Sequence, residues 1–447
     1  MNFEKNIFQN SLEKPPEKSL DERWYERFKN IGAFQDTTYL IDKKEAREKE
    51  KDSFVSDKKE NPDLNYPDLK KIDFIKQEKE LLDLKKEILA EETDEMVRNV
   101  YHWKINEKLA DLRMLKAAHE RDDRRFSRYS QFIYGKPSKD VFAYTVKNIK
   151  PIIEAGLNSP LLDIRAAAQR LQDVLIKNSR INLEEDSKIP TLPLSKLAFL
   201  KKGKTIEAEK IRSAFEGALE IFQVQGFKVI VDKEGKYQKI NINQEKRTAI
   251  IPEDRKISEE KLKALMVHEI GTHAQRREKG EHSKLKLLGL GLDRYLKGEE
   301  GVSSYSEQQI VGASDYAGFD LHLAASLSTG IDGEKRDFRA VFEILKDYYF
   351  IRSKEKDKEA ALKKSEASAW DICVRIFRGT TCKTPGACFT RDIVYREGNI
   401  GIWEIVKNNP EEARRFSVGK YDPTNSRHIW ILDQLGISDA DLEKLKD

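Results

Sequence analysis

The segment HEIGTH, which runs from His268 to His273, constrains this chain more than any other stretch of its sequence. It follows the apolar run LKALMV and therefore continues a helix. On a regular α-helix, side chains five residues apart point about 140° apart, so the two imidazoles would not face one ion. A π-helical turn, which contains one extra residue, brings them to the same side, and Gly271 eases that distortion. We therefore predict that the helix widens or ends around residues 270–272.

A metal site needs more ligands than the two histidines. Catalytic zinc has three protein ligands and one open position for water. Glu299 and Glu300 lie downstream, followed by Gly301, and a glutamate ligand of zinc peptidases commonly precedes a glycine on a second helix. This favours Glu300 as the third ligand of one Zn²⁺ ion, with Glu269 as the general base. The alternative is a helix with two partly buried histidines and no metal.

The residues before this helix predict a small sheet. FKVIVD, KININ and RTAIIP are predicted to form three short strands. The RTAIIP strand is expected to offer an edge to an extended peptide. An amphipathic helix is predicted over residues 205–224, and Ser258 is the expected N-cap of the HEIGTH helix. The expected fold class is α+β, mainly helical, with a zincin-like catalytic core and a helical N-terminal unit.

Composition shifts suggest three parts. Residues 1–65 are rich in Lys, Glu, Asp and Pro and predict a charged, flexible segment. Apolar residues at helical spacing predict a helical unit over 66–183. A proline-containing loop then leads to the predicted catalytic domain, 184–447.

Charge and cysteine content narrow the function classes. The 82 basic and 78 acidic residues are interspersed and give a net charge of +4, so nucleic-acid binding is not predicted. No apolar run approaches the roughly 18 residues of a membrane span, and the N-terminus lacks a secretion signal, so a cytoplasmic protein without a membrane partner is expected. The 3 cysteines are expected to be free thiols.

The motifs resemble those of a known family. HEIGTH at 268–273, EEG at 299–301 and ACFTRDIVYREG at 387–398 are similar to the tyrosine/methionine carboxypeptidases, which include microtubule tyrosine carboxypeptidases and bacterial flavohemoglobin expression-modulating QEGLA-motif proteins. The resemblance implies zinc held by His268, His273 and Glu300, with Glu269 catalytic. Where members usually read E-G-L-A, this chain reads E-G-V-S, which affects packing beside the site rather than the ligand.

A carboxypeptidase must also bind a free C-terminal carboxylate, which suits the planar guanidinium of arginine. Arg391 lies within the recognised motif and is the first candidate for this role, with Arg378 second. The alternative for each is a salt bridge to a neighbouring acid. Tyr395 is a candidate hydrogen-bond donor to the oxyanion of the tetrahedral intermediate.

The predicted function is removal of a C-terminal residue, with tyrosine or a similar large side chain implied by the resemblance, from a peptide or protein. Two other functions stay open at this point. A zinc endopeptidase or aminopeptidase would share the metal site, and a non-catalytic regulator or adaptor would use zinc only structurally.

Overall fold

The structure of the protein is a computed structural model, and it describes residues 19–31, 39–180, 189, 190, 192, 205–233, 240–243 and 246–437. Over these residues the fold is α+β and mainly helical, as predicted. The predicted boundary between residues 183 and 184 lies outside the described residues. None of the described helices combines the length and the apolar character that crossing a lipid bilayer requires.

The N-terminal part is helical. Its elements are α1 (Glu22–Asn30), α3 (Lys44–Val55), the 3₁₀ helix η1 (Pro67–Lys71), α4 (Phe74–Glu91), α5 (Glu95–His119), α6 (Asp123–Tyr134), α7 (Lys139–Leu157), α8 (Leu162–Gln172) and the π-helical η2 (Asp173–Lys177).

The second part contains all the described strands: β1 (Thr205–Glu207), β2 (Lys228–Asp232), β3 (Asn241–Asn243), β4 (Thr248–Pro252) and β5 (Lys256–Ser258). Its helices are α9 (Ala208–Ile221), α10 (Glu259–His268), the π-helical η3 (Glu269–Ala274), α11 (Gln275–Glu281), α12 (Leu287–Leu290), α13 (Leu296–Val311), α14 (Phe319–Thr329), α15 (Phe338–Ile351), α16 (Lys358–Phe377), α17 (Ile393–Asn408) and α18 (Ser426–Gln434), with the 3₁₀ helices η4 (Thr390–Asp392) and η5 (Pro410–Arg415).

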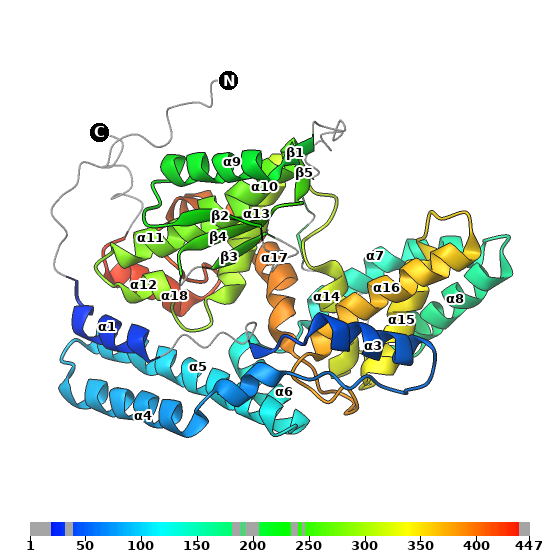
Figure 1. The fold of residues 1–447 in the computed structure, drawn as a ribbon, viewed down its shortest axis with the longest axis horizontal. Helices are drawn as coiled ribbons and strands as arrows, with labels where there is room; N and C mark the ends of the chain where they lie inside the picture. The colour runs from blue at the N-terminus through cyan, green and yellow to red at the C-terminus, as the bar shows by residue number, and fades with distance from the viewer. Residues whose placement is uncertain are drawn as a thin grey trace.

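Most of the described helices gather around one large apolar core. In Figure 1, α4, α5 and α6 run along one side of the molecule, while α7, α8, α15 and α16 form a bundle at one end. A single buried cluster includes Leu81 of α4, Leu115 of α5, Leu288 of α12 and Val341 of α15. The predicted helical unit and the predicted catalytic domain therefore share this core.

Within the described part of the segment predicted to be charged and flexible lie the two helices α1 and α3. On α1, Trp24 is 3% exposed and Tyr25 is also buried, and Phe54 of α3 is fully buried against Phe338 and Trp370. Burying such aromatic side chains offsets the cost of ordering the charged residues around them.

The three-stranded sheet has the order β2-β4-β3, with β2 parallel and β3 antiparallel to β4. Ala249 and Ile251 of β4 are buried in a cluster with residues of α9, α10 and η3, whereas Ile230 on the other face is 45% exposed. The expectation that RTAIIP offers an edge to a peptide is wrong for residues 248–250, because β4 is central and is paired there on both sides.

The start of the second part also differs from its prediction. The expected helix over 205–224 begins only at Ala208, because Thr205–Glu207 forms β1 and pairs antiparallel with β5. Because β5 ends at Ser258 and α10 begins at Glu259, the strand leads directly into the helix that carries HEIGTH.

Two glycines let α13 and α17 cross closely. A Cβ atom at Gly301 would lie 2.6 Å from the carbonyl oxygen of Gly398, and one at Gly398 would lie 2.1 Å from the carbonyl oxygen of Lys297. Any larger residue at either position would push the helices apart. The glycine that follows Glu300 is thus required by helix packing.

Candidate metal centre

The HEIGTH helix widens where the sequence predicts. Its first segment, α10, is capped by Ser258, whose hydroxyl accepts a hydrogen bond from the Lys261 amide at 3.3 Å. The chain then forms the π-helical turn η3 over Glu269–Ala274 before α11 resumes. The Thr272 hydroxyl donates to the carbonyl of Val267 at 3.1 Å, which satisfies an acceptor beside the widened turn. The predicted departure from regular α-helix is therefore confirmed.

Close packing, as well as backbone freedom, explains why residue 271 is a glycine. A Cβ at this position would lie 2.7 Å from the Phe222 ring, which follows α9. The glycine therefore allows Phe222 to pack directly on the π-helical turn.

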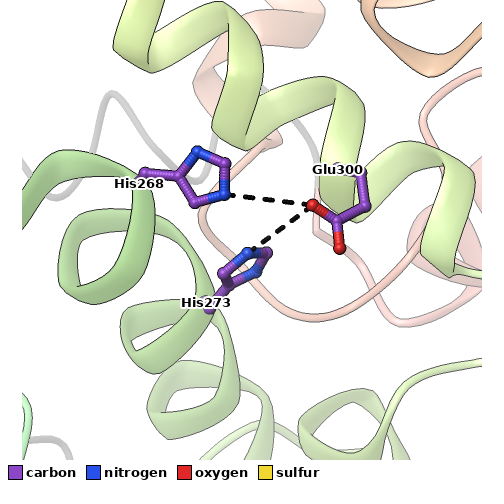
Figure 2. A group of neighbouring side chains, drawn as sticks. All are labelled: His268, His273 and Glu300. Atoms are coloured by element: carbon purple, nitrogen blue, oxygen red, sulfur yellow. Dashed lines mark ion pairs between the residues drawn. The ribbon is translucent and has the colours of Figure 1, made fainter. Parts of the chain in front are cut away.

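The π-helical turn brings both histidines to the same side (Figure 2). The Nε2 atoms of His268 and His273 lie 3.9 and 3.8 Å from the same Glu300 oxygen, Oε2. One ligand atom from each of the three residues lies within 4.8 Å of the other two. These separations leave room for an ion with bonds of about 2.0–2.2 Å, and two imidazoles with one carboxylate are a common zinc donor set.

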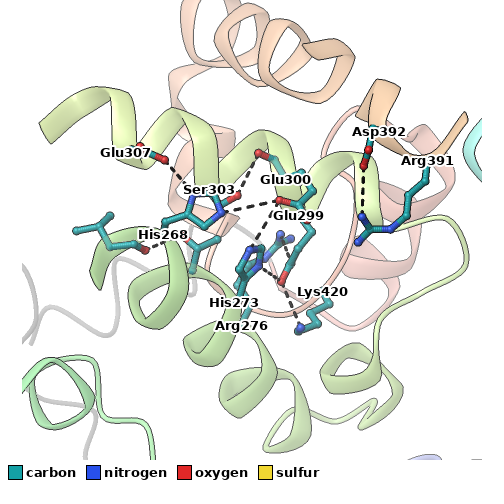
Figure 3. Close-up of polar contacts among 12 residues, drawn as sticks. His268, His273, Arg276, Glu299, Glu300, Ser303, Glu307, Arg391, Asp392 and Lys420 are labelled. Carbon is teal, nitrogen blue, oxygen red and sulfur yellow. Dashed lines mark hydrogen bonds and ion pairs between the residues drawn. The ribbon is translucent and has the colours of Figure 1, made fainter. Parts of the chain in front are cut away.

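The second nitrogen of each imidazole faces a carboxylate. Nδ1 of His273 is 2.8 Å from Glu299 Oε1, and Nδ1 of His268 is 3.1 Å from Glu307 Oε2. A carboxylate on Nδ1 favours the proton there and leaves Nε2 free to bind a metal, which is the usual arrangement around zinc. The residues present therefore fit a zinc ion, and both Nε2 atoms lie on the Glu300 side (Figure 3).

Acidic groups dominate the surroundings of His268. Burial lowers the pKa of His268, but the hydrogen bond to Glu307 and the charges of Glu269 and Glu300 raise it by more, to about 9. In the metal-free protein this environment favours a positive charge at the imidazole. The interaction also indicates that Glu269, which begins η3 and is half-buried, lies close to His268.

Glu299 lies in a buried cluster of opposite charges. Arg276 Nη1 donates to its Oε2 at 2.6 Å, and Lys420 Nζ lies 3.3 Å from its Oε1. Burial raises the pKa of Glu299, but Lys420 and Arg276 lower it by more and hold it well below its usual range. Burial lowers the pKa of Lys420, and Glu299 opposes that shift.

Tyr395 lies near the candidate metal ligands. The charge of Glu300 and then burial raise the pKa of Tyr395 to about 12, whereas Arg391 acts in the opposite direction. Its phenol is therefore close enough to Glu300 to interact electrostatically. The Arg375 guanidinium also lies 5.9 Å from the centre of the tyrosine ring.

The candidate carboxylate-binding arginines both contact one buried acid. Asp392 is fully buried, and its Oδ1 lies 3.5 Å from Arg391 and 3.7 Å from Arg378. Arg375 Nε donates to its other oxygen at 3.0 Å. Burial raises the pKa of Asp392, but the three arginines lower it by more. Figure 3 draws the Arg391–Asp392 pair apart from the two histidines.

Some residues that support the site were not found from the sequence. Glu299 was considered only as an alternative ligand, yet its carboxylate faces His273 Nδ1 rather than the Nε2 side. Glu307 stands seven residues after Glu300 on α13, a spacing that places both on one helix face and could have indicated it. Lys420 has no sequence signal, because only the tertiary fold brings it here.

Comparisons with known proteins identify a family for the chain. The sequence profile of the family described as microtubule-associated tyrosine carboxypeptidase matches residues 51–157 and 184–440. A mouse protein named microtubule-associated tyrosine carboxypeptidase 1 is 28% identical over 150 residues, which are 32% of this chain and 27% of that protein. The aligned region thus spans about a quarter of the mouse protein. No solved structure matches the chain. Since the profile covers most of its length, the chain belongs to the microtubule-associated tyrosine carboxypeptidase family.

Proposed function

We propose that this protein is a zinc-dependent carboxypeptidase that removes a C-terminal residue from a peptide or protein, with tyrosine or a similarly large side chain preferred. The observation that carries the proposal is the convergence of His268, His273 and Glu300 across a π-helical turn. Membership of a family named for tyrosine carboxypeptidase activity supports the reaction and the preferred residue.

The two histidines and Glu300 would hold one zinc ion. When bound, zinc supplies Lewis acidity, which lowers the pKa of a nearby water and polarises the peptide carbonyl. Glu269 is the general base in this proposal: its carboxylate accepts a proton from the attacking water and returns it to the leaving amine. The half-buried position of Glu269 beside His268 supports that assignment.

The substrate carboxylate would be bound by arginine. We assign this role first to Arg391 and second to Arg378, because a guanidinium can hold both oxygens of a carboxylate. Asp392, which contacts both, would fix their positions. Tyr395, which lies near Glu300, would donate a hydrogen bond to the oxyanion.

The substrate partner is thus a protein or peptide C-terminus. We further propose that the protein acts in the cytoplasm. Its Cys373, Cys382 and Cys388 are all buried and free, which suits a compartment that keeps thiols reduced.

The proposal is tested by incubating the zinc-loaded protein with a peptide library randomised at its C-terminus and identifying the products by mass spectrometry. We expect loss of single C-terminal residues, with tyrosine or other large residues enriched among those released. Chelation of the metal should abolish cleavage, and added zinc should restore it. Peptides with an amidated C-terminus should resist; their cleavage would point to an endopeptidase or aminopeptidase instead.

Glu269→Gln tests the general base. The substitution keeps the size of the side chain but removes the group that accepts the proton, so we expect zinc content to be unchanged and turnover to fall by at least about 100-fold. Glu260→Gln, in the first turn of α10, is the matched control and should behave like the parent. A Glu269→Gln protein with parental turnover would refute the assignment.

A further inference from the structure

Both carboxylate oxygens of Glu299 face hydrogen-bond donors. His273 Nδ1 and Lys420 Nζ face Oε1, at 2.8 and 3.3 Å, while Arg276 Nη1 donates to Oε2 at 2.6 Å. The glutamate is 2% exposed, so water cannot replace these partners without opening the core. Its orientation, and with it the direction of the His273 ring, is therefore determined by the two cations.

The backbone of residues 419–421 fixes the positions of both Arg276 and Lys420. Arg276 is fully buried and donates to the carbonyls of Gly419 and Tyr421, each at 2.7 Å. The Lys420 amide donates to the Leu288 carbonyl at 2.7 Å, and the Lys420 carbonyl accepts from the Leu292 amide at 3.0 Å. The ammonium group of Lys420 is thus positioned by its backbone, next to α12.

Glu307, the corresponding carboxylate on His268, is placed differently. Its side chain is 43% exposed, and its contact to the imidazole is longer, at 3.1 Å. A carboxylate open to water interacts more weakly and can reorient at little cost. The carboxylate that faces His273 is therefore held more firmly than the carboxylate that faces His268.

We propose that Glu299 is a positioning residue for His273, locked by Arg276 and Lys420, so that the metal site is completed by a segment close to the C-terminal end of the described chain. This inference rests on the proposed function to the extent that the two histidines bind a metal. It assigns to Glu299 a task different from that of its neighbour Glu300: Glu300 faces the ion and Glu299 aims the imidazole.

Glu299→Gln in the full chain is the main test, because a glutamine cannot satisfy these partners. Whichever way its amide turns, the NH₂ group faces Arg276 on one side or His273 and Lys420 on the other. We expect zinc binding, measured by competition with a chelator, to weaken by about 10- to 100-fold. The visible absorption of the Co²⁺-substituted protein should also change, since it reports ligand geometry.

The matched control is Glu307→Gln, on the same helix and facing the same type of nitrogen. Its amide oxygen can turn to His268 while the NH₂ group faces solvent, so zinc binding should weaken much less. Parental zinc affinity and an unchanged Co²⁺ spectrum in Glu299→Gln would overturn the proposal. So would an equal loss in the two variants, because the buried cations would then have no special effect.

Lys420→Met keeps the test decisive if Glu299→Gln does not fold. It leaves the Glu299–Arg276 pair intact and replaces one buried ammonium with an apolar chain of similar length. We expect a smaller loss of zinc affinity in the same direction, with a shifted Co²⁺ spectrum, and parental values would overturn the proposal. A parent that binds zinc but cleaves no peptide would contradict only the proposed function, whereas one that binds no zinc would overturn both.

Discussion

At the scale of single residues, the candidate substrate-binding arginines illustrate how one buried acid can organise several cations. Arg375, Arg378 and Arg391 all contact Asp392, which is fully buried. The sequence places these residues in one region but cannot say which of them faces a substrate. Both Arg391 and Arg375 lower the pKa of Tyr395, which Glu300 raises, so this influence does not separate them. Arg391 stays the first candidate because it lies within the recognised motif.

Arg391→Lys tests that choice while keeping the positive charge. A lysine cannot hold both oxygens of a carboxylate, so we expect about 2 kcal/mol less transition-state binding, or about 30-fold lower kcat/KM on free-acid peptides. Zinc affinity should stay at the parental value. Arg378→Lys is the matched control with a smaller expected effect, and a larger loss there would transfer the assignment to Arg378.

At the scale of elements, α13 and α17 pack closely right beside Glu300, one of the candidate metal ligands. The backbones of Gly301 and Gly398 touch where the helices cross, and Glu300 immediately precedes that contact. Glycine normally weakens a helix, so its presence inside α13 indicates that close packing outweighs helix propensity here.

Gly301→Ala should therefore destabilise the protein despite the higher helix propensity of alanine. Its methyl group would collide with backbone atoms of Gly398, and we expect a loss of about 1–3 kcal/mol in the free energy of unfolding, together with weaker zinc binding. Gly217 in α9 provides a control, since a Cβ there meets no heavy atom within 4 Å. Gly217→Ala should stabilise by about 0.5–1 kcal/mol in the same urea titration. Equal effects of the two substitutions would contradict the packing argument.

At the scale of the whole molecule, the segment around α1 joins the N-terminal helices to the part that carries the site. Asp21 is 1% exposed and accepts hydrogen bonds from the Lys286 and Leu287 amides at 2.8 and 3.0 Å, and from the Tyr101 hydroxyl at 2.8 Å. It thereby connects α5 to the start of α12. Tyr25 extends the contact by donating to Glu281 at 2.6 Å.

Asp21→Ala should be far more damaging than a change at its neighbour. The substitution leaves buried donors without an acceptor, at about 1–3 kcal/mol for each, so we expect roughly 3 kcal/mol or more of lost stability. Glu22→Ala removes only a surface ion pair with Lys286, in which Glu22 is 54% exposed, and should cost at most about 1 kcal/mol. Urea unfolding of both variants checks the difference, and similar midpoints would argue against a structural role for the segment.

Local patterns were sufficient for the elements and for the unusual helix. Apolar spacing predicted the helical unit that contains α4 to α8, and short apolar segments predicted β2, β3 and β4. The five-residue separation of His268 and His273 predicted that their helix widens or ends, and a π-helical turn is observed there. These predictions succeed because helical periodicity and helix geometry depend on residues close together in the chain.

Contacts between distant segments decided the rest. The order β2-β4-β3, which makes β4 central, depends on strand pairing that short segments do not encode. The Glu299–Lys420 contact and the gathering of three arginines around Asp392 likewise depend on how separate helices and loops pack. The sequence by itself determined which residues could bind a metal and how their helix must deform. Only the tertiary structure decided which buried charges surround them, because burial and long-range pairing arise when the whole chain packs.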